Sequence, residues 1–110
     1  MSHEDVYSTV SAIVPCRHME WPEDSAPPLP WALYHGEDDP ICADDCQIAV
    51  RHHWTVELYQ KGSDPDLELS LANALREKFG SVKRQEQWVE NDNMLQILFT
   101  FYQIEGDFDG

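Results

Sequence analysis

Three cysteines and one histidine form a set of side chains that could hold a metal ion. Three thiols and an imidazole are a composition that tetrahedral zinc accepts. The members of the set are Cys16, His18, Cys42 and Cys46. Neither the Cys-x-His spacing nor the Cys-x-x-x-Cys spacing stands in the turn context of a zinc knuckle, and the intervening Asp44 and Asp45 would compete as hard ligands. We therefore predict no metal here and treat the cysteines as packing or loop residues, but the sequence leaves open whether the four residues meet in the fold.

The adjacent residues His52 and His53 are a second candidate pair for metal binding. Both fall in a stretch of alternating apolar residues that predicts a β-strand, and neighbouring side chains of a strand point to opposite faces. The two rings therefore cannot bind one ion together. We expect one ring to be packed and the other to be solvated.

Pairs of carboxylates could bind a hard cation such as calcium or magnesium. They stand at Asp38-Asp39, just before Pro40, and at Asp44-Asp45. The spacing of an EF-hand loop is absent, so we predict solvated turns instead. The chain also has no serine flanked by glycines in a Gly-x-Ser-x-Gly motif, no cysteine–histidine signature and no phosphate-cradling glycine loop. The sequence thus predicts a protein with neither enzymatic activity nor a cofactor.

Size and charge limit the partners that this chain can have. Its 110 residues suit a single domain, spanning 1–110, and a hydrophobic fraction of 42% is enough for one core. Seven Lys and Arg stand against 21 Asp and Glu, which gives a formal net charge of −14. This charge repels phosphate, so we exclude binding in nucleic-acid grooves. Two interpretations stay open: the charge keeps the protein soluble, or it meets a partner with a basic surface.

The N-terminal sequence and the cysteine count indicate where the protein is made. The first residues have no basic start and no continuous apolar run, so they are not typical of a signal peptide. No stretch approaches the roughly 20 apolar residues of a membrane-spanning helix. An odd number of cysteines suits a reducing compartment. We expect synthesis and assembly in a cytosol, without a membrane partner.

Local patterns predict a short N-terminal helix followed by a connector. The helix is expected between a cap at Ser2 and a stop at Pro15. Its apolar face would consist of Val6, Val10, Ile13 and Val14. Residues 15–30 are rich in proline and predict an extended connector.

Two strands and an acidic turn are predicted next. Residues 31–35 form a short aromatic strand, residues 36–45 an acidic turn, and residues 47–59 a long strand with alternating apolar side chains. The turn would contain Glu37 and the two aspartate pairs.

The clearest local prediction is a helix over residues 65–79. Ser63 or Asp64 can cap it, Pro65 suits its first position, and Gly80 is placed for a left-handed stop. Its apolar stripe consists of Leu67, Leu71, Ala74, Leu75 and Phe79.

Two further strands, at residues 82–89 and 94–104, are predicted with a turn between them. In the last strand the side chains expected to face the helix are Leu95, Ile97, Phe99 and Phe101. Leu98 and Tyr102 point to the other face, and two outward apolar side chains indicate a surface that another subunit covers. Residues 105–110 form an acidic end that should fray.

Together these elements predict an α+β fold. Its sheet would be mostly antiparallel, with about four to five strands. One main helix would pack on one face of this sheet, beside a short N-terminal helix.

An ordered series of short motifs covers much of the chain. They are an aromatic strand at Trp31, the step Ala43-Asp44, the strand end Glu57-Leu58-Tyr59, Lys61 with Asp64-Pro65 at a helix start, leucines at Leu67, Leu71 and Leu75, the strand Glu86-Gln87-Trp88-Val89-Glu90, and Leu95-Gln96-Ile97 leading to Phe99-Thr100-Phe101. In this order the chain resembles the tail-terminator, or tail-completion, proteins of long-tailed bacteriophages. It departs from them at His52-His53, at the two cysteines Cys42 and Cys46, and in the proline-rich segment.

The resemblance implies a structural protein of the virion. Such a protein forms a ring, usually a hexamer in that family, which caps the tail tube, ends its polymerisation and helps to join the tail to the head connector. The implied partners are further copies of the chain, the tail-tube protein and the head-completion connector protein. The implied location is the head-proximal end of the tail, after assembly in the host cytoplasm. DNA would pass through the ring without specific binding.

Two groups of residues are expected to make the contacts. The apolar pair Leu98 and Tyr102 would lie at subunit or tube contacts. The acidic residues expected to face DNA or a basic partner are Glu37, Asp38, Asp39, Asp44 and Asp45. The alternative, which follows from charge alone, is a monomeric acidic adaptor or inhibitor that binds a basic protein surface.

Overall fold

A computed structural model describes residues 3–22, 26–44, 46–90 and 93–106 of the chain. These residues form two helices and one five-stranded sheet. In chain order the elements are α1 (His3–Ser11), β1 (Cys16–His18), β2 (Trp31–Ala43), β3 (Cys46–Gln60), α2 (Pro65–Phe79), β4 (Lys83–Val89) and β5 (Met94–Gly106).

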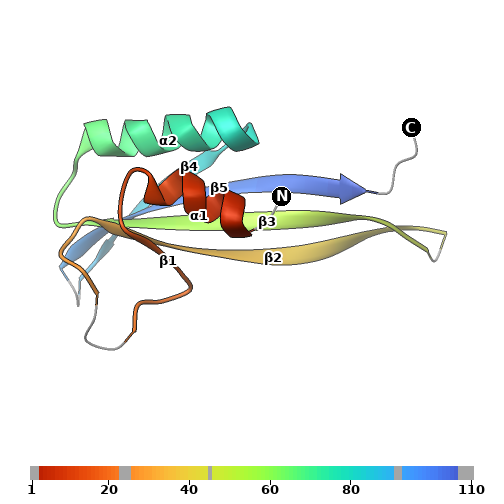
Figure 1. Ribbon diagram of the computed structural model, residues 1–110, viewed down its shortest axis with the longest axis horizontal. Coiled ribbons are helices and arrows are strands. Elements are labelled where there is room, and N and C mark those ends of the chain that lie inside the picture. The colour runs from red at the N-terminus through yellow and green to blue at the C-terminus, as the bar shows by residue number, and fades with distance from the viewer. Residues whose placement is uncertain (1–2, 23–25, 45, 91–92, 107–110) are drawn as a thin grey trace.

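The strands lie side by side in the order β1-β2-β3-β5-β4. β1 pairs with β2 in parallel, and the other pairings are antiparallel. Both helices lie on the same face of the sheet (Figure 1). We call this face the inner face and the opposite one the outer face. The arrangement confirms the predicted α+β fold with a mostly antiparallel sheet.

The core forms between the inner face and the two helices. α1 contributes Val6 and Val10, and α2 contributes Leu71 and Leu75, all with no exposed surface. Alternation along the strands sends further side chains into the same layer: Trp54, Val56, Leu58, Ile97, Phe99 and Phe101. The predicted inward set of the last strand is thereby confirmed, since Leu95 also packs against this core.

Helix α2 begins and ends as predicted. The Asp64 carboxylate accepts a hydrogen bond from the Leu67 N–H at 3.2 Å, and Pro65 opens the helix. Gly80 follows the last turn with a φ of 92°, which suits glycine, and donates its N–H to the Arg76 carbonyl at 2.8 Å. Neither helix in the described part of the chain has the length and apolarity that crossing a membrane requires.

The connector is not simply extended, as the prediction for residues 15–30 had it. Its first residues form β1, and Cys16 and His18 pair with Ala32 and Tyr34 of β2. The N–H of Met19, whose φ is 70°, then donates to the Tyr34 carbonyl at 2.9 Å. A three-residue strand has too little alternation to be recognised from sequence, and it forms here because the edge of β2 offers free backbone partners.

The predicted acidic turn at residues 36–45 is wrong. These residues continue β2 through Pro40 to Ala43, and they pair with β3 with a bulge between Ile41 and Cys42. The change of direction is confined to the end of the hairpin, where Asp44 has a φ of 50°. Asp45 lies outside the described residues. Pairing across the strands outweighs the low intrinsic strand preference of aspartate and proline.

The last strand is longer than predicted. Glu105 and Gly106 pair with Val50 and Ala49 of β3, so they belong to β5 and not to a frayed end. The rest of the predicted tail, residues 107–110, lies outside the described part of the chain, as does the predicted helix cap at Ser2. The antiparallel pairing of β4 with β5 is as predicted.

The sheet extends beyond the helices. β2 and β3 continue as a long hairpin, and β5 lies beside β3 for part of its length (Figure 1). We call residues 37–53 the arm. The molecule measures 49 × 28 × 22 Å with a radius of gyration of 15.7 Å. A compact chain of this length would have a radius of gyration of about 13 Å, so the arm makes the protein elongated.

Candidate interaction surfaces

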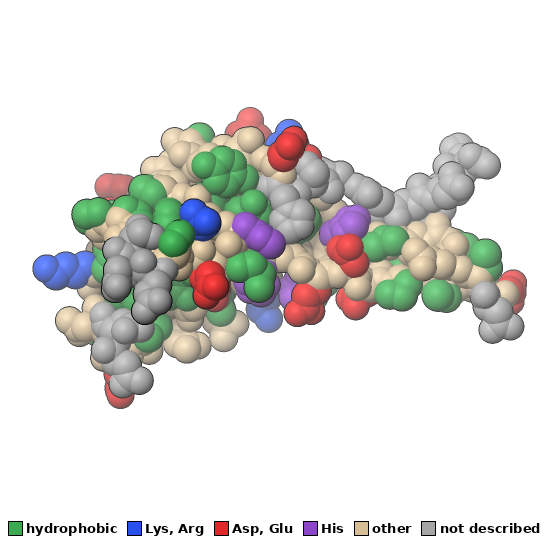
Figure 2. Space-filling view, turned by 60° about the horizontal axis from the view of Figure 1, so that its bottom comes forward, with side chains coloured by type: hydrophobic (Ala, Val, Ile, Leu, Met, Phe, Trp, Pro, Cys, Tyr) green, Lys and Arg blue, Asp and Glu red, His purple; other side chains and the backbone are tan. Residues whose placement is uncertain are grey.

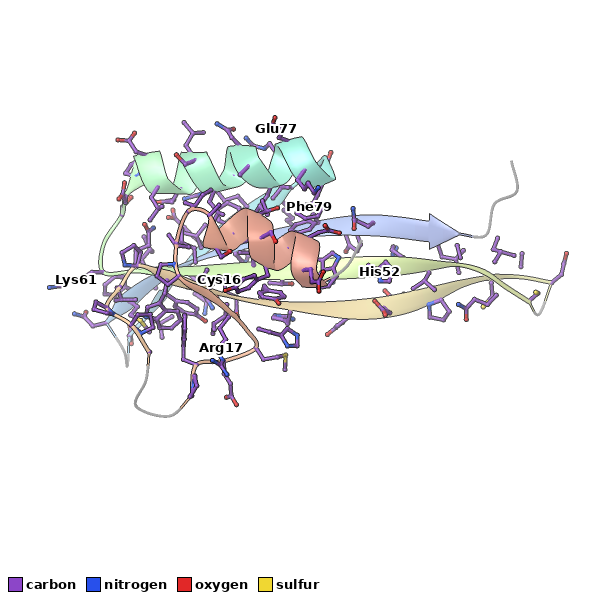
Figure 3. The ribbon with its side chains drawn as sticks, in the orientation of Figure 1. Cys16, Arg17, His52, Lys61, Glu77 and Phe79 are labelled. Carbon is purple, nitrogen blue, oxygen red and sulfur yellow. The ribbon has the colours of Figure 1, made fainter. Side chains whose placement is uncertain are left out.

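The fold separates the cysteines and histidine considered for zinc. Cys16 lies in β1 under the helices (Figure 3). Cys42 and Cys46 lie at the far end of the arm, where β2 and β3 pair. Cys16 lies opposite Ala32 of β2, and Cys42 follows Ala32 by ten residues in the same strand, which corresponds to roughly 33 Å. His18 stays beside Cys16 and packs against Tyr34, with ring centroids 5.2 Å apart. Within the described residues, no three His, Cys, Asp or Glu side chains are grouped to hold a metal.

The thiols differ in their surroundings. Cys16 is buried, and burial raises its pKa to about 12, so the thiol stays protonated at neutral pH. Cys42 and Cys46 are exposed. Cys46 lies opposite Ala43, and Cys42 lies opposite Gln47. Because adjacent strand positions face opposite sides, Cys42 and Cys46 point to different faces of the arm.

The adjacent histidines also face opposite sides, as predicted. His52 lies on the inner face, where its Nδ1 is 2.5 Å from the Oδ1 of Asp38. His53 lies on the outer face and stacks on Tyr102, with ring centroids 4.6 Å apart and planes 14° from parallel. Both rings therefore contact other side chains of the sheet, and the prediction that one is merely solvated is wrong.

The acidic residues of the arm lie opposite basic residues of the same chain. Glu37 pairs in register with His53, Asp38 with His52, and Asp39 with Arg51. The Arg51 guanidinium donates to the Asp39 carboxylate at 3.2 Å. An exposed pair of this kind contributes at most about 1 kcal/mol, but the match of three successive positions favours this register over its neighbours.

This geometry corrects the expectation of an acidic cluster facing one way. Glu37 and Asp39 point to the outer face, and Asp38 points to the inner face. Asp44 is exposed at the end of the hairpin. Figure 2 shows acidic and histidine side chains intermixed where the arm leaves the body of the molecule. Of the five predicted acidic contact residues, Asp45 is outside the described part of the chain, and Asp38 and Asp39 already contact basic side chains of the arm.

Leu98 and Tyr102 lie on the outer face, as predicted. Leu98 is half-buried between its strand neighbours Glu57 and Gln85. Tyr102 is 54% exposed, although His53 covers one side of its ring. The Arg51 guanidinium carbon lies 5.1 Å from the centre of the same ring, within reach of a cation–π contact. The outward orientation of the pair is confirmed, and its contact with another subunit remains a prediction.

The arm carries exposed apolar side chains that the sequence interpretation missed. Ile48 is 42% exposed, and Ile41 and Val50 are only partly buried. Figure 2 shows hydrophobic side chains along the arm, away from the helices. The pairing with β5 ends at Ala49, so the described part of the arm beyond it is a two-stranded ribbon. Such a ribbon is marginally stable in water on its own, and this end of the arm therefore suits contact with another molecule. The sequence feature that indicates a strand here is the short apolar run around Ile41. The aspartates on both sides of this run favour the interpretation as a turn.

Glu68 is a buried carboxylate that the sequence analysis did not single out. It is 6% exposed, accepts a hydrogen bond from Gln60 of β3 at 3.1 Å, and pairs with Arg84 of β4. Burial alone would raise its pKa, but the hydrogen bonds from Arg84 and Gln60 and the Arg84 charge outweigh burial and hold the pKa below its usual value. The position is three and seven residues before Leu71 and Leu75, so helical spacing could have identified it as buried.

Comparisons with known proteins add no family to this geometry. No protein-family model matches the chain, and no curated protein matches it.

Proposed function

We propose that this chain is a structural virion protein that forms a ring on the end of a phage tail tube. The observation that carries the proposal is the arm, which projects beyond the helices with apolar side chains exposed and with no layer packed on it from the described residues. Exposure of its apolar side chains to water is unfavourable, so the arm suits contact with another molecule. It supports a function in assembly rather than in catalysis.

The ring would end the polymerisation of the tail tube and join the tail to the head connector. A contact between two different surfaces of neighbouring copies closes into a ring when the rotation per subunit divides a full turn. Leu98 and Tyr102, on the outer face, would lie at contacts with the neighbouring subunit or with the tube. The proposed partners are copies of the chain, in a hexamer, the tail-tube protein and the head-completion connector protein.

The charge of the chain is consistent with such a ring. A formal net charge of −14 would line a lumen with groups that repel phosphate, so that DNA passes without being held. No cofactor and no enzymatic step is required. The ring would stand at the head-proximal end of the tail after assembly in the host cytoplasm.

Electron microscopy of particles made without this protein tests the proposal. We expect tails of irregular and excessive length, and heads that are not joined to tails. Supplying the wild-type protein in trans should restore tails of uniform length on joined heads. Uniform tails attached to heads in the absence of the protein would overturn the proposal.

The second candidate, a monomeric acidic adaptor or inhibitor, is favoured by the net charge of −14 alone. Two of the carboxylates of the arm already contact Arg51 and His52, which weakens the case for a free acidic surface. Mass measurement separates the two functions. A single monomer mass from micromolar to millimolar concentration, together with normal tails in the deletion, would favour the adaptor.

A further inference from the structure

The sheet has an uncovered backbone edge on each side. β1 pairs with β2 only as far as Tyr34, so residues 35–43 of β2 have a strand neighbour on one side alone among the described residues. β4 is the last strand of the sheet, and its far edge likewise has no strand beside it in the described part of the chain. Unpaired strand edges bind other strands unless charge or geometry prevents this.

The two edges carry opposite charge. The β2 edge presents Glu37, Asp38 and Asp39 in succession, whereas β4 begins with Lys83 and Arg84. Arg84 is already bound to Glu68, so Lys83 is the cation that β4 can offer to another molecule. Basic residues are scarce here, with seven Lys and Arg against 21 Asp and Glu, so a strand that starts with two of them is notable.

A hollow of about 500 Å³ adjoins the start of β4. Its lining includes Lys83, Thr100, His53 and Tyr102, and none of its lining residues is a carboxylate. The hollow lies where β4 begins beside β5, because Lys83 pairs with Thr100 while β5 continues past this point to Gly106. An acidic strand could therefore contact this hollow without meeting a carboxylate in its lining.

The faces on which these charges lie also agree. Lys83, Thr100, Thr55 and His35 form one row across the sheet, so they share the outer face. Glu37 and Asp39 follow His35 by two and four residues and lie on that same face. If the sheet of a second copy continued the sheet of the first, Glu37 and Asp39 of one copy and the Lys83 ammonium of the other would lie on the same outer face.

We propose that residues 35–43 of β2 in one copy pair with the edge of β4 in the next copy, with Glu37 and Asp39 against Lys83. This inference rests on the proposed ring and names the edges that would form it. The two edges lie on opposite sides of the sheet, so the contact repeats from copy to copy and can close. Pairing of two β2 edges is opposed by repulsion between facing carboxylates, which the pairing with β4 avoids.

Cysteine cross-linking tests this contact directly. The background carries Cys42→Ser and Cys46→Ser, and it keeps Cys16, which is buried. In it, Glu37→Cys and Lys83→Cys are combined in one chain and treated with a short bis-maleimide, both as purified protein and in assembled tails. We expect a ladder of covalent oligomers up to the closed ring. A mixture of the two single variants should stop at dimers, and each single variant alone should stay monomeric.

The matched control carries Glu77→Cys in place of Lys83→Cys. Glu77 lies on α2 and points away from the sheet (Figure 3). This control should give no ladder. Charge reversal is the second measurement: Lys83→Glu should abolish the ring, and adding Glu37→Lys in the same chain should restore it. Homodimers of the Glu37→Cys variant, or no ladder in either preparation, would overturn the edge contact.

The outcomes separate this inference from the proposed function. Rings visible by electron microscopy without a cross-linked ladder would overturn the edge contact and leave the ring intact. If particles made without the protein have normal tails but the double-cysteine variant gives a ladder of cross-linked oligomers, the tail function is overturned. The edge contact is then supported as the contact of an oligomer with another function.

Discussion

At the scale of single residues, Glu68 connects three parts of the fold. Its carboxylate lies on α2, its hydrogen-bond donor Gln60 on β3, and its ion-pair partner Arg84 on β4. The Ser63 hydroxyl, 3.4 Å away, adds the loop before the helix. A buried carboxylate without these partners would be strongly destabilising, so the group acts as a unit.

We predict that Glu68→Ala lowers the free energy of unfolding by about 1–3 kcal/mol at pH 7. The Arg84 side chain is 39% exposed and regains water, which keeps the cost below that of a fully buried pair. Because the folded pKa of Glu68 lies below its ordinary 4.5, the stabilisation is present above that pH and is lost as the pH falls through the folded pKa. Urea unfolding across pH should therefore show the difference between wild type and variant shrinking below pH 4.5.

Glu77→Ala is the control, since Glu77 is exposed on the same helix. It should change the free energy of unfolding by less than about 0.5 kcal/mol. Equal effects of the two substitutions at pH 7 would contradict a buried role for Glu68.

The three thiols should react at two different rates. Cys42 and Cys46 are exposed, whereas burial raises the pKa of Cys16 to about 12. At pH 8 only about one Cys16 in ten thousand would be a thiolate, and the reagent must also reach it. We expect a colorimetric thiol reagent to modify two thiols rapidly in the folded protein and the third only after denaturation. Equal rates for all three would show that β1 does not shield Cys16.

At the scale of elements, the packing of the Trp54 ring against the backbone of β2 depends on a glycine. A Cβ added at Gly36 would lie 2.6 Å from the Trp54 ring atoms Cε3 and Cζ3, well inside contact distance. Gly36 and Trp54 are direct partners in the register, so the ring lies over the glycine. The absence of a side chain at position 36 is thus what lets Trp54 enter the core layer.

We predict that Gly36→Ala lowers the free energy of unfolding by about 1–3 kcal/mol, because the Trp54 ring must move from its place in the core. The tryptophan emission should shift to longer wavelength as the ring becomes more exposed. Gly62→Ala is the matched control, since nothing lies within 4 Å of the added Cβ. An unchanged unfolding midpoint for Gly36→Ala would show that the strand can shift at no cost.

The packing of α2 on the sheet gives a second prediction at this scale. Truncating Leu71 or Leu75, both fully buried, to Ala should cost about 2–5 kcal/mol, because each substitution removes core contacts and leaves a cavity. Leu69 lies on the same helix but is 56% exposed, so Leu69→Ala should cost less than about 0.5 kcal/mol. Chemical denaturation of the three variants measures the contrast. A change under half a kcal/mol at Leu71 or Leu75 would remove the helix from the core.

At the scale of the whole molecule, the elongated shape and an outer face that neither described helix covers are features of a subunit. The helices cover one face of the sheet, and the arm projects past them (Figure 1). Leu98 and Tyr102 lie on the outer face, where Leu98 is half-buried and Tyr102 is exposed. Their substitution therefore separates assembly from folding.

We predict that Leu98→Asp leaves the monomer folded but prevents its association in a ring or with tails. On the free monomer the new carboxylate can reach water, whereas an interface would bury it unpaired at a cost of several kcal/mol. Circular dichroism checks the fold, and electron microscopy of tails checks assembly. The control is Leu69→Asp, which adds the same charge on the exposed side of α2. Normal tails with the Leu98 variant would exclude this residue from the interface.

Much of the fold was determined by local sequence. Asp64, Pro65 and Gly80 mark the ends of α2, and the leucine spacing marks its buried side, so the helix was predicted at its observed bounds. Alternation along 94–104 likewise determined that Ile97 and Phe99 point inward and that Tyr102 points outward. These features depend on residues within a few positions of one another, and such short-range patterns can be read without knowing the fold.

Only the tertiary structure decided the rest. The acidic residues 37–39 form a strand because Arg51, His52 and His53 lie opposite them, and β1 forms because β2 offers it an edge. The ring of Tyr102 meets His53 only in this one register of β3 with β5. These contacts join residues far apart in the chain, and a one-residue shift in pairing would change every partner, so no local pattern contains them.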